Sequence, residues 1–473
     1  MKPFRLFLAN VGKRQVEFPL VTPPMGIMSL AAYIRSRYNA DIRLLNQKVP
    51  NCPNSRVVAM AREFKADVVG LSATSPTAHN LPEITHGIKA AMPGTLIVLG
   101  GAHVSSVGGD AMANTEADAA VAGEGEIALE QILRARFEGD TLADVPGIFR
   151  RTQDGRIVQN PGRIPFIKDI DTLPPPAYDL IDLPPYWKLQ SMPPLPRRRY
   201  ASLFSSRGCP YKCIYCHRIF GSKFRYHSAE RIADEMQYLQ KTYGVNDIEF
   251  LDDIFNLNKK RIFALSEHMQ ARNIHTKLAF PNGVRTDIFT KEELKTLVDM
   301  GMYFASFALE SGSPRIQQLI GKKLNIDRFL ENVRYAVSLG VFANGFAMMG
   351  FPTETETDLQ RTIDVACQSR LHTISFFTTT PFPNTPMHTM AQQKYPERVS
   401  AIPFDDMEYA GLTVNLSDVP DHVLFAYQRK ANRRFFLKPG RMARLIRDFP
   451  KPHLLPLYLP VFIRRASKGL VRH

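Results

Sequence analysis

Along the first part of the chain, short apolar runs alternate with segments in which apolar residues recur every three or four positions. The runs are typical of buried strands and the periodic segments of amphipathic helices. Strands are expected at residues 5–10, 41–46, 67–73, 96–101 and 119–122. Helices are expected at residues 25–35, 55–64 and 81–91, and another is expected after residue 126. This alternation predicts an α/β fold with a doubly wound parallel sheet.

A second series of strands and helices follows a proline-rich stretch near residues 161–196. Strands are expected at residues 201–205, 247–251, 277–280, 304–309, 342–349 and 373–379. Helices fit between them, for example at residues 229–242 and 291–300. Six such units predict a partial or complete parallel (β/α) barrel. In both kinds of parallel sheet, ligands bind at the carboxyl ends of the strands.

Four regions result from this pattern. They are a sheet domain at residues 1–150, a linker at 151–195, a barrel at 196–415 and a helical basic tail at 416–473. From Gln428 to the end, the tail carries 13 Lys and Arg residues against one acid, Asp448. A docked helix with a solvated basic face, attachment to an anionic membrane surface, and nucleic-acid binding all fit this composition. No recognised nucleic-acid module is present, so we expect no nucleic-acid partner.

The bulk composition adds little to this prediction of fold and domains. The chain has 473 residues, 44% hydrophobic content and a net charge of +15, which fits a folded protein with two or three domains. No run approaches the roughly 20 apolar residues that span a bilayer, and no signal peptide is evident. Five cysteines, three of them clustered, argue against a disulfide framework. A reducing, cytoplasmic location is therefore expected, with membrane association as an alternative.

The clustered cysteines are the most specific feature of the chain. Cys209, Cys213 and Cys216 have the spacing CxxxCxxC and directly follow a predicted strand. Three thiolates on one tight loop can hold three irons of a [4Fe-4S] cluster and leave the fourth iron open to a substrate. A zinc site completed by His217, or three buried cysteines without a ligand, are the alternatives. No second cysteine pair or spaced histidine pair supports zinc.

These cysteines and Tyr215 beside the last of them resemble the radical S-adenosylmethionine (radical SAM) family over residues 198–415. The resemblance implies that the cysteines bind the cluster, that its open iron binds S-adenosylmethionine, and that Tyr215 lies against the adenine. It also implies cofactor contacts for acids and polar residues after the second, third and fourth strands. These are Asp252, Asp253, Asn282, Arg285 and Glu310. Helix capping or surface pairing is the alternative for the three acids. The segment 345–354 resembles the element of the fifth strand that packs on adenine, but it departs from that pattern by one residue at both ends.

The sheet domain ahead of such a barrel resembles the cobalamin-binding domain of one radical SAM subgroup. The resemblance rests on the segment from Pro23 and Pro24 through the first helix and on three strand ends, at residues 71–74, 100–103 and 123–126. Cofactor contacts are implied for Ser72, Thr74, Gly100, Gly101, His103, Gly123, Glu124 and Gly125. Small residues there allow a nucleotide tail to approach the backbone closely. The Asp-x-His-x-x-Gly motif is absent, so the resemblance implies cobalamin without a histidine on cobalt. A sheet domain that binds no cofactor is the alternative.

Together the two resemblances imply a cobalamin-dependent radical SAM enzyme. Its expected reaction is methylation of a carbon in a small-molecule or lipid-like substrate through an adenosyl radical. Ring formation, ring contraction or oxidation without methyl transfer, and a non-enzymatic iron–sulfur carrier or sensor, are the alternatives. An electron donor such as flavodoxin or ferredoxin is the implied protein partner. Four apolar residues, Phe376, Phe377, Phe382 and Met387, fit either the core or an apolar substrate site.

Overall fold

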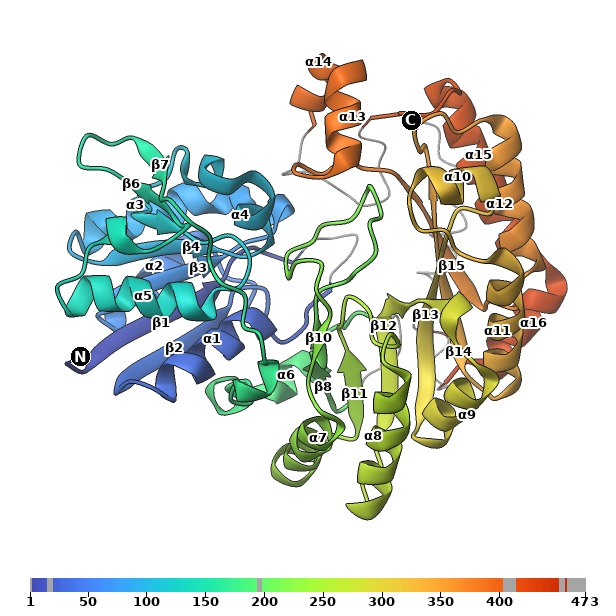
Figure 1. Ribbon diagram of the computed structural model, residues 1–473, viewed down its shortest axis with the longest axis horizontal. Coiled ribbons are helices and arrows are strands. Elements are labelled where there is room, and N and C mark those ends of the chain that lie inside the picture. The colour runs from blue at the N-terminus through green and yellow to red at the C-terminus, as the bar shows by residue number, and fades with distance from the viewer. Residues whose placement is uncertain (1, 15–19, 194–197, 403–413, 451–455, 457–473) are drawn as a thin grey trace.

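The computed structural model describes residues 2–14, 20–193, 198–402, 414–450 and 456. Two α/β domains lie beside each other, as Figure 1 shows, with the N-terminal domain in blue to cyan and the barrel in green to orange. The linker and the segment around β9 and β10 run between them. The expected α/β class is therefore confirmed.

The N-terminal domain is built on a seven-stranded sheet in the order β2-β1-β3-β4-β5-β6-β7. Its strands are β1 (Phe4–Asn10), β2 (Ala40–Asn46), β3 (Val68–Ser72), β4 (Leu96–Gly100), β5 (Ala119–Ala120), β6 (Phe149–Arg151) and β7 (Ile157–Gln159). The first five are parallel, and β6 and β7 continue the sheet as an antiparallel hairpin. The sheet thus extends past residue 150 and takes in the start of the predicted linker.

Helices cover both faces of this sheet, which makes it doubly wound. They are α1 (Met25–Arg35), α2 (Asn54–Glu63), α3 (Leu81–Ala91), α4 (Ala102–Val107) and α5 (Glu126–Phe137). Successive residues of a strand point to opposite faces. Accordingly Leu6 and Leu8 pack in one core with α1 and α5, whereas Phe7 and Ala9 pack in another with α2 and α3. Burial of alternate apolar residues on both faces explains the nearly continuous apolar runs of the sequence.

The barrel is a six-stranded, all-parallel sheet in the order β15-β14-β13-β12-β11-β8. Its strands are β8 (Tyr200–Leu203), β11 (Asp247–Phe250), β12 (Lys277–Val284), β13 (Met302–Glu310), β14 (Phe342–Met349) and β15 (Thr373–Thr378). Its helices are α7 (Ala229–Tyr243), α8 (Lys259–Ala271), α9 (Lys291–Asp299), α10 (Pro314–Leu319), α11 (Ile326–Ser338) and α12 (Glu356–Gln368). Within the described residues β8 and β15 do not pair, so the barrel is partial.

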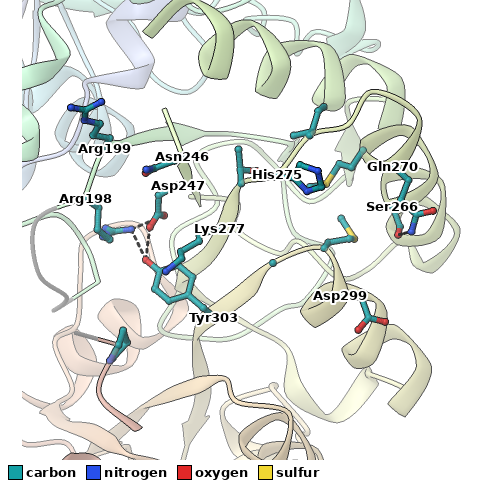
Figure 2. Close-up of a pocket in the computed structure, with 16 residues that line it drawn as sticks. Arg198, Arg199, Asn246, Asp247, Ser266, Gln270, His275, Lys277, Asp299 and Tyr303 are labelled. Carbon is teal, nitrogen blue, oxygen red and sulfur yellow. Dashed lines mark hydrogen bonds and ion pairs between the residues drawn. The ribbon is translucent and has the colours of Figure 1, made fainter. Parts of the chain in front are cut away.

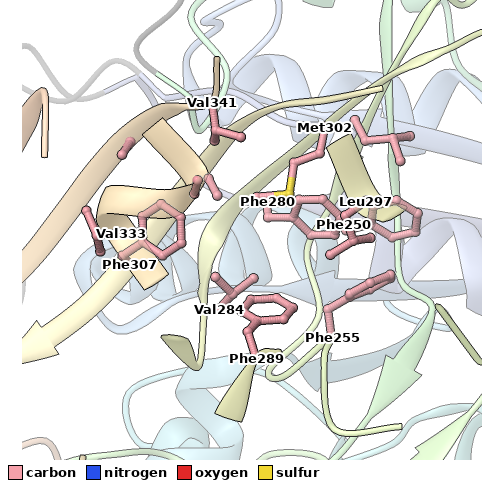
Figure 3. Packing of buried hydrophobic residues seen from close by; sticks show 14 of the residues in the cluster. Phe250, Phe255, Phe280, Val284, Phe289, Leu297, Met302, Phe307, Val333 and Val341 are labelled. Atoms are coloured by element: carbon pink, nitrogen blue, oxygen red, sulfur yellow. The ribbon is translucent and has the colours of Figure 1, made fainter. Parts of the chain in front are cut away.

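The outward faces of these strands and the surrounding helices form the largest core. Figure 3 shows Phe250, Phe255 and Phe280 meeting in it, with the rings of Phe250 and Phe280 stacked 5.2 Å apart. The predicted strand at 277–280 continues to Val284, with a register shift between Phe280 and Val284. Pro281 and Asn282 occupy this irregular part, where a strand tolerates a proline. Asn282 is thereby carried on the strand itself.

The inward faces of the strands form successive layers. At the amino end, Phe304 and Phe342 pack against Leu445 and Phe449. Above them a buried polar ladder joins Ser306, Asn344 and Thr373, with Asn344 hydrogen-bonded to both of its neighbours at 3.1 and 2.8 Å. The barrel is therefore closed at its amino end and open toward its carboxyl end.

The described tail contains two helices, α15 (Asp421–Phe436) and α16 (Pro439–Asp448). Of the closing residues, Leu445 lies on α16 and Phe449 directly follows it. Arg441 donates hydrogen bonds to the carbonyls of Leu371, Cys367 and Ser369 at 2.9 to 3.2 Å, and Arg444 also donates to Leu371. Both arginines are buried. These two side chains therefore face the barrel and are not part of a solvated basic face. The apolar stretch 454–463 lies outside the described residues apart from residue 456.

Smaller elements complete the chain. They are α6 (Leu183–Trp187) in the linker, the two-stranded ribbon β9 (Ser206–Arg207) and β10 (Arg225–Tyr226), and α13 (Pro386–Lys394) and α14 (Pro396–Ser400) beyond the last barrel strand. Among the helices described here, none has the length and apolar character needed to cross a membrane.

Candidate functional site

The three clustered cysteines lie on one loop closed by the β9–β10 ribbon. Arg207 and Arg225 are partners in the ribbon, so residues 208–224 form the loop between them. Gly208 begins it with a φ of +84°, and a Cβ there would lie 2.5 Å from the carbonyl oxygen of Lys223. Only glycine fits this close approach of the two ends of the loop.

The loop is also fastened at its far side. The Ile214 amide donates to the Ile320 carbonyl at 3.1 Å, and the Met387 amide donates to the Ile214 carbonyl at 3.0 Å. The first contact joins the loop to the end of α10 and the second joins it to α13. The cysteine loop is therefore held over the carboxyl end of the barrel, as the sequence predicted.

The thiols interact with one another electrostatically. Burial raises the pKa of Cys209 and of Cys213, and the neighbouring Cys213 adds to the rise at Cys209. Burial followed by Cys213 also raises the pKa of Cys216. Positive ions placed among these sulfurs would relieve this repulsion and stabilise the thiolates.

The donor set fits an iron–sulfur cluster better than zinc. As they stand, no three His, Cys, Asp or Glu side chains in the described ranges are arranged to hold a metal ion. The candidate fourth zinc ligand, His217, approaches Ser106 Oγ with Nδ1 at 3.3 Å, and its ring lies 5.1 Å from that of Phe382. Three thiols on one loop suit a cluster with three protein ligands, whereas zinc needs a fourth.

The acids after the second barrel strand have different surroundings. Asp252 is buried and accepts hydrogen bonds from the Ser205 amide at 2.6 Å and from the hydroxyls of Ser205 and Ser206. It fixes the turn that leads into the cysteine loop. Asp253 instead borders an open cavity, and burial together with Asp252 raises its pKa to about 6. Asp253 in turn raises the pKa of Cys209 and Cys216, so it lies close to both.

Glu310 and Tyr215 lie at the carboxyl end of the barrel near the loop. Glu310, which ends β13 with a φ of +60°, pairs with Lys322 at 3.0 Å. The Tyr215 ring lies 5.7 Å from that of Phe351, in the segment after β14. Together these residues surround Cys213 with one aromatic pair and one ion pair, because both Tyr215 and Glu310 affect its pKa.

The two predicted residues of β12 and its following turn are held by the barrel. Asn282 donates to the Asp252 carbonyl at 3.0 Å and borders the same cavity as Asp253. The Arg285 guanidinium lies 3.8 Å from the centre of the Tyr211 ring and pairs with Asp287 at 3.1 Å. Arg285 therefore braces the cysteine loop from the side.

The cavity lies between the two domains and has a volume of about 570 Å³. Its N-terminal wall is formed by the carboxyl ends of β1, β3, β4 and β5 and by the start of α1. The predicted residues that line it are Ser72, Thr74, Gly100, Gly101, Gly123, Glu124 and Gly125. His103 does not line it; its Nδ1 lies 3.4 Å from Ser75 Oγ. Asp253 and Asn282 belong to the opposite wall, so the cavity brings seven of the eight predicted residues of the N-terminal domain to two predicted residues of the barrel. The other predicted barrel residues, among them the three cysteines, do not line it.

The N-terminal wall fits a large flat ligand with a long tail. Apolar side chains and glycines form most of it, including Leu8, Pro24, Gly26 and Leu30. A Cβ added at Gly26 would meet nothing within 4 Å, so the cavity is open at this point. Cobalamin needs such a gap between sheet and helices for its nucleotide tail.

Several cavity residues were not predicted from the sequence. Examples are Lys48, Phe204, Arg207 and Phe220. Arg207 lies on the ribbon and Phe220 on the cysteine loop. Their closeness to Cys209 along the chain could have identified them as residues near the cofactor site. Lys48, in contrast, follows β2 and carries no motif; burial lowers its pKa.

A second hollow, of about 670 Å³, lies at the amino ends of β8, β11, β12 and β13 (Figure 2). Two of its charged residues, Arg198 and Asp247, pair with each other. Arg198 pairs with Asp247 at 2.7 Å and with Glu249, and Tyr303 donates to Asp247 at 2.6 Å. Because ligands of parallel barrels bind at the opposite end of the strands, we assign the functional site to the interdomain cavity.

Comparison with known proteins agrees with this geometry. The model of the radical SAM superfamily matches residues 203–366, and that of the B12 binding domain matches residues 15–133. An uncharacterised methyltransferase of Pyrococcus horikoshii is 28% identical over 455 residues, which cover 95% of this chain and 94% of the relative. An anaerobic magnesium-protoporphyrin IX monomethyl ester cyclase of Cereibacter sphaeroides is 24% identical over 373 residues, covering 77% of this chain and 60% of the cyclase.

Among solved structures, the radical S-adenosylmethionine methyltransferase TsrM from Kitasatospora setae, with cobalamin and a [4Fe-4S] cluster bound, has the same fold. The TM-score is 0.68 at 18% identity, over 82% of this chain and 75% of TsrM. The two family models therefore match the two domains seen in the structure, in the same order. The chain belongs to the radical SAM proteins that carry an N-terminal cobalamin-binding domain.

Proposed function

We propose that this protein is a cobalamin-dependent radical SAM enzyme that methylates a carbon atom of an apolar small molecule. The observation that carries the proposal is the shared cavity. Strand ends of the N-terminal domain form one wall, and Asp253, Asn282 and Phe220 next to the cysteine loop form the other. A substrate between these walls can reach both cofactor sites at once. Hydrogen abstraction and methyl transfer at one carbon require that both cofactors lie close to it.

When bound, the cluster supplies the electron that cleaves S-adenosylmethionine, and cobalamin supplies a transferable methyl group. The chain's own residues hold and orient these groups. Cys209, Cys213 and Cys216 provide three thiolates, and Tyr215 with Phe351 forms an aromatic wall beside them. Asn282 keeps its amide between the end of β11 and the cavity.

The inner wall of the barrel supports an apolar substrate. Above the polar ladder, the inward side chains of β13, β14 and β15 are only partly buried. They include Ala308, Phe346, Met348, Ser375 and Phe377, with the rings of Phe346 and Phe377 6.0 Å apart. The inward positions of β14 and β15 carry no ionisable side chain. Such a wall excludes water from a reactive carbon and favours an uncharged hydrocarbon or aromatic group.

Of the four apolar residues singled out from the sequence, two belong to the core and two are candidates for substrate contact. Phe376 packs outward against Phe435, and Met387 is fully buried, so both belong to the core. Phe377 points into the barrel, and Phe382 lies against His217 of the cysteine loop. Phe377 and Phe382 are therefore our candidates for substrate contact.

A cyclase-type reaction is the second candidate, because the relatives include monomethyl ester cyclases. The two reactions differ in the mass change of the substrate. An iron–sulfur carrier or sensor is disfavoured. Neither would need a cavity that joins the cysteine loop to the cobalamin-binding domain. We further propose that flavodoxin or ferredoxin supplies the electrons and that the enzyme works in the cytoplasm.

Replacing Cys213 with alanine should abolish cluster binding, because only two thiols of the loop remain. After anaerobic reconstitution with iron and sulfide, visible absorbance of the cluster and reductive cleavage of S-adenosylmethionine should fall at least ten-fold. Cys367→Ala, which removes a cysteine of α12 far from the loop, is the matched control. Purification of the wild-type protein with zinc and without iron would refute the cluster assignment.

Replacing Gly26 with leucine should block cobalamin uptake. The new side chain would extend into the cavity without a backbone clash, since nothing lies within 4 Å of the Cβ position. We expect at least a ten-fold loss of affinity for hydroxocobalamin in equilibrium dialysis, with unchanged thermal stability. Gly94→Leu is the control, because its Cβ position is equally open but lies outside the cavity. Equal cobalamin affinity in both variants would place the cofactor elsewhere.

We also propose that the tail helices contact an anionic membrane surface, which would give access to a lipid-like substrate. Leu437 and Ile446 are 66% and 52% exposed, and exposed cations lie near them in sequence at Arg433, Lys438 and Arg447. Apolar side chains flanked by cations suit an interface with anionic lipid.

The full-length protein should float with vesicles containing phosphatidylglycerol, and the combined change Leu437→Asp and Ile446→Asp should reduce the bound fraction at least five-fold. Tyr238→Asp, which alters an exposed aromatic residue of α7, should leave flotation unchanged. Absence of wild-type flotation at low salt would rule the membrane contact out.

A further inference from the structure

The ribbon that closes the cysteine loop places two arginines side by side. Arg207 on β9 and Arg225 on β10 are paired residues of the antiparallel ribbon, and the loop 208–224 begins and ends between them. Their side chains are 11% and 5% exposed. Two neighbouring buried cations repel each other strongly unless anions compensate them.

The compensating anions come from the N-terminal domain. Glu124 Oε1 lies 2.7 Å from Arg225 Nη1 and 3.5 Å from Arg207 Nη1, and Glu126 Oε1 lies 2.6 Å from Arg207 Nη2. The carboxylates are 2% and 4% exposed. Two arginines and two glutamates thus form a buried, neutral cluster across the two domains.

Each carboxylate is also fixed within its surroundings. Glu124 Oε2 accepts from the Ile167 amide at 2.9 Å, and Glu126 Oε1 accepts from the Ser29 hydroxyl at 2.8 Å. Burial alone would raise the pKa of Glu126, but the charge and hydrogen bond of Arg207, together with the hydrogen bond from Ser29, hold the pKa below its ordinary value. Glu126 therefore stays charged and paired at neutral pH.

The ribbon end of the cysteine loop meets the N-terminal domain at further points. Ser106 Oγ lies 3.3 Å from His217 Nδ1, and a Cβ at Gly123 would lie 3.5 Å from the Ile219 carbonyl. Arg225 Nη2 donates to the Phe220 carbonyl at 2.8 Å, inside the loop itself. The cysteine loop is thus bound to the neighbouring domain more directly than through the linker.

We propose that Glu124, Glu126, Arg207 and Arg225 form an interdomain clamp that fixes the cysteine loop relative to the strand ends of the N-terminal domain. The four side chains are positioning residues. Their importance for methyl transfer rests on the proposed function, whereas the clamp itself does not. The Gly-Glu-Gly-Glu segment after β5 then serves the domain contact through its acids and the cavity through its glycines.

Hydrogen exchange of the full-length protein, without added cofactors and under anaerobic conditions, tests the clamp. In Glu124→Gln and in Glu126→Gln, the amides of residues 208–224 should exchange at least ten-fold faster, with unchanged protection in β11–β15. Asp179→Asn is the matched control, because it removes an Arg–carboxylate pair with Arg35 that is exposed to solvent. It should leave exchange in the loop unchanged.

Two further variants separate a clamp from a general loss of stability. Arg225→Lys keeps the charge and should give an intermediate increase, and the double variant Glu126→Gln with Arg207→Gln should exchange no faster than Arg207→Gln alone. Unchanged exchange in the loop, or an equal increase throughout the barrel, would overturn the clamp.

The reconstituted protein provides a readout at the cofactors. Pulsed electron paramagnetic resonance should show the distance distribution between cob(II)alamin and the reduced cluster at least doubled in width in Glu126→Gln, with both cofactors retained. An unchanged width would contradict a positioning role. Failure of methyl transfer in the wild-type protein would refute the proposed function and leave the exchange result standing.

Discussion

Parallel strands end together at one edge of their sheet, and this constraint determines where the chemistry of the molecule is. The strands of the N-terminal sheet end in small residues around Ser72 and Gly100, and those of the barrel end beneath the cysteine loop. The two edges face a common cavity. Short segments at these edges are enough to place Asp253 of one domain and Gly100 of the other in the same cavity. Methyl transfer to a substrate held between two cofactors needs this arrangement more than it needs any single acid or base.

More of the charged side chains interact inside the protein than the composition suggests. The net charge of +15 invites a search for an anionic partner, yet several arginines are used internally. Arg198 pairs with Asp247 and Glu249, Arg441 satisfies carbonyls after α12, and Arg207 joins the two domains. Removing one member of a buried pair leaves the other uncompensated, typically at a cost of about 3–5 kcal/mol. Such pairs therefore specify the arrangement of elements even where they add little net stability.

The sequence predicted the long, regular features well. The barrel strands begin within about two residues of their expected positions, because an apolar run between polar turns marks a buried strand. The β6–β7 hairpin and the β9–β10 ribbon were missed, since strands of two or three residues show no periodicity. The cysteine loop was found from its spacing alone. The partners of Glu124 were not, because Arg207 and Arg225 lie some eighty to one hundred residues further along the chain and only folding brings them together.

The central claim is transfer of a methyl group to carbon in a cavity shared by two cofactors. The most direct test is mass spectrometry of apolar extracts from a deletion strain, followed by incubation of the accumulated compound with reconstituted enzyme and S-[methyl-²H₃]adenosylmethionine. For a methylase, we expect a compound lighter than the wild-type product by one methylene group, which the enzyme converts to a product bearing the labelled methyl group. A compound that differs by the hydrogens or oxygen of a ring closure or oxidation, with no label incorporated, would contradict the central claim.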